Sequence, residues 1–135
     1  MTVFLDTSAF VALLDEDNAD YALARSAWRD LLVQGHDLHT TNYVVLETTA
    51  VLHRRTGLRA VSALVITALP ACEVAWVPPA VHEAALAGLL VANRRDLSLV
   101  DCVSFDYMRR QGITTAFTFD PHFSDQGFEV IPARA

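Results

Sequence analysis

The 135-residue chain contains no lysine, and all ten of its basic residues are arginine. This absence excludes the phosphate-binding loop that ends in Gly-Lys-Ser/Thr, because the lysine of that loop contacts the nucleotide phosphates. It also excludes enzymes that form a Schiff base through a lysine amine. The chemistry of this protein must therefore use other side chains.

Cysteine is scarce, and long apolar runs are absent. Cys72 and Cys102 are far apart in sequence and match no metal-ligand spacing, so we expect buried thiols and no disulfide. The longest apolar stretch, residues 60–72, is interrupted by Ser62, Thr67 and Pro70, which predicts no membrane span. No basic segment followed by an apolar one marks secretion, so we expect a cytoplasmic protein that does not bind a membrane.

The composition, 53% apolar and 19% charged residues, predicts a single folded domain over residues 1–135. The net charge of −6 argues against nucleic-acid binding through a broad basic surface. It does not argue against an enzyme that holds a phosphodiester through a bound metal ion.

Strand-like and helix-like segments alternate along the chain. We predict strands at residues 3–5, 37–40, 73–77, 113–119 and 128–132, and helices at residues 9–14, 20–34, 43–56, 59–69, 80–93 and 99–111. Asn42 and Ser98 are the expected N-caps of the third and sixth helices. This alternation predicts an α/β fold, a three-layer α/β/α sandwich with a central, mainly parallel sheet.

Two aspartates are expected at the carboxyl ends of strands, the edge where open α/β sheets bind their ligands. Asp6 follows the first strand, and Asp120 ends the strand at residues 113–119. Each has a simpler interpretation: Asp6 can cap the following helix, and Asp120 can form an Asp-Pro turn.

Two further acids lie on predicted helices. Glu47 has Val44 and Ala50 three residues away on either side, which places it on an apolar face, where glutamate is rare unless paired or metal-bound. Asp101 follows Ser98 by three residues, the spacing of a capping box. The alternatives are a misjudged face for Glu47 and a purely structural cap for Asp101.

If the four acids share one site, their repulsion needs relief. Each pair of charges about 6 Å apart costs about 2.8 kcal/mol at an effective dielectric constant near 20, so six pairs cost about 17 kcal/mol. Protonation, arginine or cations must offset it, and oxygen ligands favour Mg²⁺ or Mn²⁺. The five histidines are scattered, so zinc is not expected. His122 is interpreted as a turn residue, with a contact to a phosphate or to the metal site as the alternative, and Asp96 as solvated.

These residues resemble the PIN domain, specifically the toxin ribonucleases of VapBC-type toxin–antitoxin pairs. The resemblance rests on Val-Phe-Leu-Asp-Thr-Ser at residues 3–8, Glu47 in a helix, Leu-Ser-Leu-Val-Asp at residues 97–101, and Thr-Phe-Asp-Pro-His-Phe at residues 118–123. It implies a doubly wound parallel sheet and Mg²⁺- or Mn²⁺-dependent endoribonuclease activity. By position it makes Asp6, Glu47, Asp101 and Asp120 the catalytic and metal-binding acids, supported by Ser8 and Thr118.

The resemblance also implies partners: an RNA substrate, a cognate antitoxin protein and a second copy of the chain in a homodimer. The apolar helices around Trp28 and at residues 43–52 are the expected contact surfaces. In such a site metal-activated water attacks the phosphodiester, and no side-chain nucleophile is required.

The sequence leaves two other functions open. An aspartate-nucleophile phosphatase also has an Asp after its first strand, but it needs a second Asp where this chain has Ser8, and it needs a lysine. A PIN-like module that binds RNA or protein without cutting is not excluded by sequence.

Overall fold

A parallel sheet lies at the centre of the computed structural model, which describes residues 1–133. Within this range the sheet has five strands, in the order β3-β2-β1-β4-β5. Every neighbouring pair is parallel, as predicted. The strands are β1 (Thr2–Leu5), β2 (Asp37–Thr41), β3 (Glu73–Ala75), β4 (Thr115–Phe117) and β5 (Glu129–Ile131).

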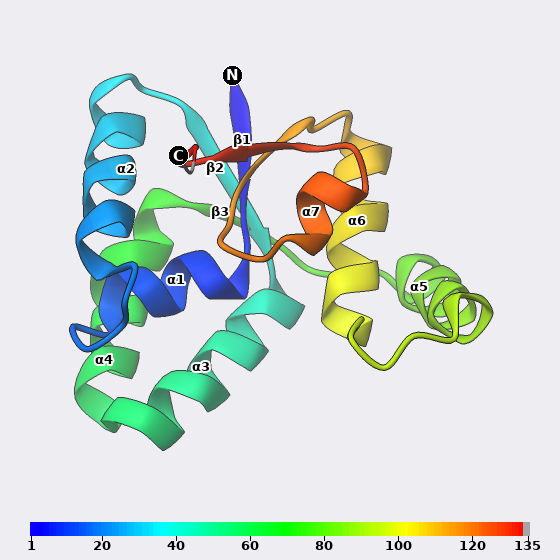
Figure 1. The fold of residues 1–135 in the computed structure, drawn as a ribbon, viewed down its shortest axis with the longest axis horizontal. Helices are drawn as coiled ribbons and strands as arrows, with labels where there is room; N and C mark the ends of the chain where they lie inside the picture. The colour runs from blue at the N-terminus through cyan, green and yellow to red at the C-terminus, as the bar shows by residue number, and fades with distance from the viewer. Residues whose placement is uncertain (134–135) are drawn as a thin grey trace.

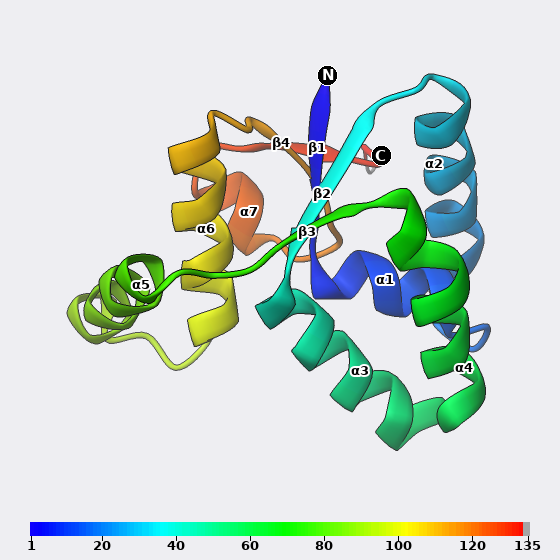
Figure 2. The same ribbon diagram turned by 180° about the vertical axis from the view of Figure 1, so that it is seen from behind.

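Helices cover both faces of this sheet, which confirms the three-layer prediction (Figures 1 and 2). One side carries α1, α2 and α4, the other carries α5, α6 and α7, and α3 lies at the carboxyl ends of the strands. The helices are α1 (Thr7–Leu14), α2 (Tyr21–Val33), α3 (Asn42–Thr56), α4 (Leu58–Ala63), α5 (Pro79–Ala92), α6 (Leu99–Gln111) and α7 (His122–Asp125).

The central strand β1 is buried on both faces. Val3, Phe4 and Leu5 have no exposed surface, which explains why the sequence here is a continuous apolar run and not an alternating one. The Phe4 ring packs against the rings of Tyr107 and Phe123, so that β1, α6 and α7 share one core. The residue after β1 is therefore held by the most buried part of the fold.

The strand at residues 113–119 is shorter than predicted. Leu5 pairs with Phe117, where β4 ends, so Thr118 lies beside Asp6. The Thr118 hydroxyl accepts a hydrogen bond from the backbone N–H of Asp120 at 2.9 Å, a side-chain turn that competes with the strand ladder. The prediction that Asp120 ends the strand is therefore wrong: Asp120 lies three residues beyond it, in a loop.

Two helix predictions also need correction. The cap of α3 is Thr41, whose hydroxyl accepts from the N–H of Val44, whereas the side chain of Asn42 accepts from the N–H of Val77. The predicted helix at residues 59–69 is α4, continued by a π-helical turn (Leu64–Ala68) and a 3-10 turn (Leu69–Ala71). The single-turn helix α7 was not predicted, because four residues carry no periodic pattern.

Cys72 and Cys102 are free thiols, as expected, but both are half-buried and not fully buried. In the part of the chain that the structure describes, no helix combines the length and the apolar character needed to cross a bilayer.

Candidate metal centre

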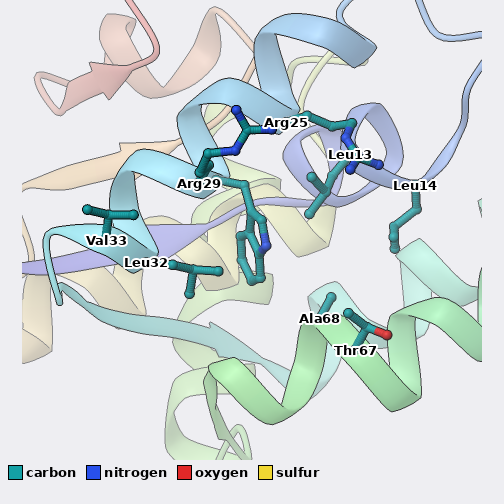
Figure 3. Close-up of a pocket in the computed structure, with 9 residues that line it drawn as sticks. Leu13, Leu14, Arg25, Arg29, Leu32, Val33, Thr67 and Ala68 are labelled. Carbon is teal, nitrogen blue, oxygen red and sulfur yellow. The ribbon is translucent and has the colours of Figure 1, made fainter.

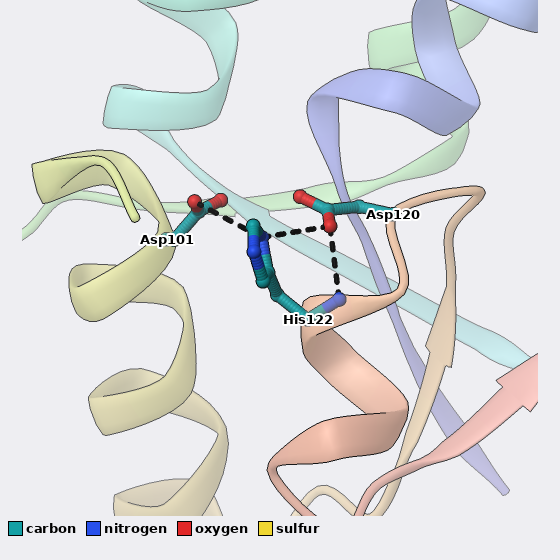
Figure 4. Close-up of side chains that lie close together, drawn as sticks. All are labelled: Asp101, Asp120 and His122. Atoms are coloured by element: carbon teal, nitrogen blue, oxygen red, sulfur yellow. Dashed lines mark hydrogen bonds and ion pairs between the residues drawn. The ribbon is translucent and has the colours of Figure 1, made fainter. Parts of the chain in front are cut away.

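Three of the four predicted acids converge at the carboxyl edge of the sheet. Asp6 follows β1 directly, Asp101 lies in the first turn of α6, and Asp120 lies in the loop after β4. Asp101, Asp120 and His122 each offer a ligand atom within 4.8 Å of the others (Figure 4). Asp6 lies deeper, next to this group.

Asp6 is almost fully buried and is both a helix cap and a site residue. Its Oδ2 atom accepts hydrogen bonds from the Ser8 hydroxyl at 2.8 Å, the Thr118 hydroxyl at 3.0 Å and the N–H of Ser8 at 3.4 Å. Burial raises the pKa of Asp6 to about 6; the hydrogen bonds oppose this rise, and the charges of Asp101 and Asp120 add to it. Ser8 and Thr118 thus support Asp6 directly.

Asp101 is fixed by the capping box that the sequence predicted. Its Oδ2 atom accepts from the N–H of Ser98 at 3.0 Å, and its own N–H donates to the Ser98 hydroxyl at 3.0 Å. Burial raises the pKa of Asp101, and the charges of Asp120 and Glu47 raise it further against the opposing hydrogen bonds. The capping box therefore holds the carboxylate of Asp101 close to those of Asp120 and Glu47.

Loss of this cap should have a measurable cost. We expect Ser98→Ala to lower the free energy of unfolding by about 1 kcal/mol, because the N–H of Asp101 loses its acceptor. Urea denaturation monitored by circular dichroism measures this. Ser26→Ala, an exposed serine on α2, is the control and should change stability by less than about 0.5 kcal/mol. Equal effects of both substitutions would show that the capping box does not stabilise α6.

Glu47 is half-buried. The prediction of a fully buried glutamate on an apolar face is therefore only partly correct. The buried residues of α3 are Val44, Thr48 and Leu52, and the neighbouring Leu46 is 71% exposed. Glu47 is nevertheless close enough to raise the pKa of Asp101. Glu47 lies at the rim of the site, outside the group formed by Asp101, Asp120 and His122.

His122 is more than the turn residue that the sequence suggested. Its ring Nδ1 lies 2.9 Å from Oδ1 of Asp120 and 3.9 Å from Oδ2 of Asp101 (Figure 4). Its Nε2 lies 3.1 Å from Oδ2 of Asp96, whose carboxylate also accepts two hydrogen bonds from Arg94. The hydrogen bond to Asp96 raises the pKa of His122, and Asp120 and Asp101 contribute to the rise. Asp96, expected to be solvated, is half-exposed and tied to the site through His122.

Arginine does not offset the charge of this acid cluster. Between residues 1 and 133, no arginine lies within ion-pair distance of Asp6, Glu47, Asp101 or Asp120. The basic group that meets these acids is the imidazole of His122, whose Nδ1 lies 2.9 Å from Oδ1 of Asp120. Converging carboxylate oxygens are also the ligand type that hard divalent cations bind, so these residues fit a metal centre.

Two grooves on the described surface bear on what the protein could bind. One of about 320 Å³ starts at Thr118 and Asp120 and extends over Pro121 and Val130 to Pro132. The other, of about 410 Å³, is mainly apolar and lies between α1, α2 and the π-helical turn that follows α4 (Figure 3). It is lined by Leu13, Leu14, Arg25, Trp28, Arg29, Leu32, Val33, Thr67 and Ala68.

Comparison with known proteins identifies the family and relatives of similar sequence and structure. Residues 3–129 match the PIN domain. The 23S rRNA-specific endonuclease VapC20 of Mycobacterium tuberculosis is 36% identical over 132 residues, which is 96% of this chain and 98% of the relative. The crystal structure of that VapC20, described as a Sarcin-Ricin loop cleaving toxin, superposes with a TM-score of 0.83 at 35% identity, over 93% of this chain and 95% of that chain.

Two more distant structures share the fold alone. FitAcB from Neisseria gonorrhoeae gives a TM-score of 0.68 at 14% identity, over 96% of both chains. VapBC2 from Rickettsia felis, bound to a promoter DNA fragment, gives 0.69 at 13% identity, over 96% of this chain and 97% of that chain.

Proposed function

The chain belongs to the PIN-domain family, and from this premise we propose that it is an endoribonuclease that hydrolyses RNA phosphodiester bonds with a bound Mg²⁺ or Mn²⁺. We further propose that it acts in the cytoplasm as the toxin of a toxin–antitoxin pair. The assigned catalytic and metal-binding residues are Asp6, Glu47, Asp101 and Asp120, with Ser8 and Thr118 in support.

The observation that supports the proposal most is the convergence of Asp101 and Asp120 in front of the buried Asp6. Burial raises the pKa of Asp6 and of Asp101, and the charges of neighbouring acids raise it further, so keeping these two carboxylates ionised costs stability in the absence of a cation. A purely structural site would relieve that cost with arginine, and the chain has ten arginines available. A site built to receive a divalent cation leaves the carboxylates open to it.

Each residue has a defined task in this proposal. Asp101 and Asp120 hold the cation, and Glu47 adds negative charge at the rim. Ser8 and Thr118 both donate to Oδ2 of Asp6, which fixes that carboxylate and leaves its Oδ1 without a donor in the described chain. When bound, the cation supplies activation of a water molecule and stabilisation of the leaving oxygen.

The substrate class follows from the relative that shares 36% of its residues with this chain. That protein is named for 23S rRNA and its structure for the sarcin–ricin loop. We infer that this chain also cleaves a large ribosomal RNA. The groove from Asp120 to Pro132 gives the RNA a path away from the acids.

We also propose two protein partners, an antitoxin and a second copy of the chain. The apolar groove around Trp28, bordered by Arg25 and Arg29, suits an apolar antitoxin segment that carries acidic residues (Figure 3). A homodimer is also proposed, and Leu46 of α3 belongs to the exposed apolar surface available for such a contact. The phosphatase alternative loses support, because Ser8 binds Asp6 where that enzyme needs a second acid.

Metal removal tests the proposed activity. Purified protein is incubated with total RNA, and the 5′ ends of the RNA are then mapped. Discrete new RNA ends should appear with Mg²⁺ or Mn²⁺ and none with EDTA. Adding excess cation to the EDTA sample should restore cleavage. Equal cleavage with EDTA would contradict the metal site. RNA binding without new ends under every condition would instead identify a silent binding module.

A further inference from the structure

The side chain of His122 occupies a place in the acid cluster that a structural histidine does not need. We propose that its Nδ1 atom is a ligand of the divalent cation together with Asp101 and Asp120, and that this nitrogen makes the site bind Mn²⁺ in preference to Mg²⁺. The inference rests on the proposed function, because it assigns one more ligand to the same centre.

The distances suit one shared cation. Nδ1 of His122 is 2.9 Å from Oδ1 of Asp120 and 3.9 Å from Oδ2 of Asp101, and all three ligand atoms lie within 4.8 Å. An octahedral ion with bonds of about 2.1 Å separates adjacent ligands by roughly 3.0 Å and opposite ligands by roughly 4.2 Å. Small side-chain adjustments therefore bring all three atoms to one ion.

The second ring nitrogen is already held by a carboxylate. Nε2 of His122 lies 3.1 Å from Oδ2 of Asp96, and Arg94 fixes Asp96 with two hydrogen bonds of 3.0 and 2.6 Å. Histidines that bind metals usually donate their other N–H to a carboxylate in this way, because the bond fixes the tautomer and the ring plane. Here it leaves Nδ1 directed at the acids.

The Nδ1 atom itself is buried and makes no hydrogen bond of acceptable geometry with any residue between 1 and 133. Asp120 Oδ1, which accepts the backbone N–H of His122 at 2.9 Å, lies 2.9 Å from Nδ1, but this contact does not have the geometry of a hydrogen bond. A buried polar atom without a hydrogen-bond partner destabilises the fold. In native structures such an atom usually has an explanation, such as a bound ion, a water molecule or a functional role. A cation between Nδ1 and the two carboxylates would satisfy it.

The backbone beneath the imidazole is rigid enough for this task. The next residue, Phe123, has no exposed surface and packs against Phe4, Phe105 and Phe128. These contacts anchor α7 to β1 and α6, the element that carries Asp101. The imidazole and Asp101 are thus positioned by one continuous apolar core.

A nitrogen ligand changes which ion the site selects. Mg²⁺ binds oxygen almost exclusively and keeps several waters, whereas imidazole suits transition metals. Replacing one oxygen ligand with an imidazole nitrogen therefore favours Mn²⁺. A site with carboxylates alone would discriminate less between the two ions.

The test uses the full chain loaded with Mn²⁺ and pulsed electron paramagnetic resonance, which detects a ¹⁴N nucleus bonded to the ion. The wild type should show the ¹⁴N modulation of a histidine, and His122→Ala and His122→Gln should lose it while still folding by circular dichroism. His36→Asn is the control, because His36 is only partly buried and its Nε2 lies 2.9 Å from Oε1 of Gln34. That variant should keep the signal.

Calorimetric titration gives a second readout. His122→Ala should weaken Mn²⁺ binding by at least about 10-fold, with a smaller change for Mg²⁺. Bound Mn²⁺ without a ¹⁴N signal in the wild type, or a signal that persists in both His122 variants, would overturn the ligand assignment, and metal-dependent RNA cleavage by the same wild-type sample would leave the proposed function standing. Absence of both Mn²⁺ binding and RNA cleavage in the wild type would overturn both proposals.

Discussion

Asp101→Asn is expected to lower the rate constant of RNA cleavage by at least about 100-fold. Loss of a residue that only supports a metal ligand costs about 10- to 100-fold, so loss of a ligand should cost more. The amide oxygen of asparagine can still accept the hydrogen bond from the N–H of Ser98, and the backbone N–H at position 101 still donates to the Ser98 hydroxyl. The fold should therefore persist while the charge is lost.

The measurement is single-turnover cleavage of a mapped RNA at saturating protein, with Mn²⁺ binding measured in parallel. Asp106→Asn is the matched control, because Asp106 is on the same helix but pairs with Arg110 outside the site. It should cleave like the wild type. Unchanged cleavage by Asp101→Asn would remove Asp101 from the catalytic machinery.

Asp6→Asn is expected to stabilise the metal-free protein at pH 7.5 by up to about 3 kcal/mol. The folded pKa of Asp6 is about 6, against 3.8 for an ordinary aspartate, and a rise of that size corresponds to about 3 kcal/mol. Below about pH 4 the carboxyl group is protonated in both states and costs nothing. As the pH rises from about 4 to 6, the unfolded chain ionises first, so the wild type loses stability.

Urea denaturation in EDTA at pH 4.5, 6.0 and 7.5 measures this difference. The advantage of Asp6→Asn should grow through the window from about pH 4 to 6 and then remain constant. Asp30→Asn, which changes an exposed acid on α2, is the control and should show no such growth. A difference that does not depend on pH, or a variant less stable at every pH, would show that the Ser8 and Thr118 hydrogen bonds outweigh the burial of the charge.

The parts of the fold with strong local patterns were predictable from sequence. The apolar run of β1, the Ser98 cap of α6 and the glycine after that helix each carry their information within a few residues. The alternation of strands and helices then leads to a parallel sheet. Because parallel strands share one carboxyl edge, the sequence pattern alone places Asp6 and the loop with Asp120 at the same edge of the sheet.

The predictions that failed concern features that depend on contacts between distant segments of the chain. His122 meets Asp96, which is 26 residues earlier, and no local pattern encodes that meeting. The true end of β4 depends on the Thr118 hydroxyl, which bonds both Asp6 and the N–H of Asp120. The exposure of Glu47 depends on how far α3 extends beyond the sheet. The spacing Asp-x-His at residues 120–122 was the available signal for His122, but it is also common in turns.

The central claim is that a divalent cation held by Asp101 and Asp120 acts directly on the scissile phosphate. Sulfur substitution of a non-bridging oxygen at the mapped cleavage site tests it, because Mg²⁺ binds sulfur poorly and Mn²⁺ accepts it more readily. We predict that one phosphorothioate diastereomer resists cleavage in Mg²⁺ and is cleaved again when Mn²⁺ is added. Equal cleavage of both diastereomers and of the unmodified RNA in Mg²⁺ would contradict the claim.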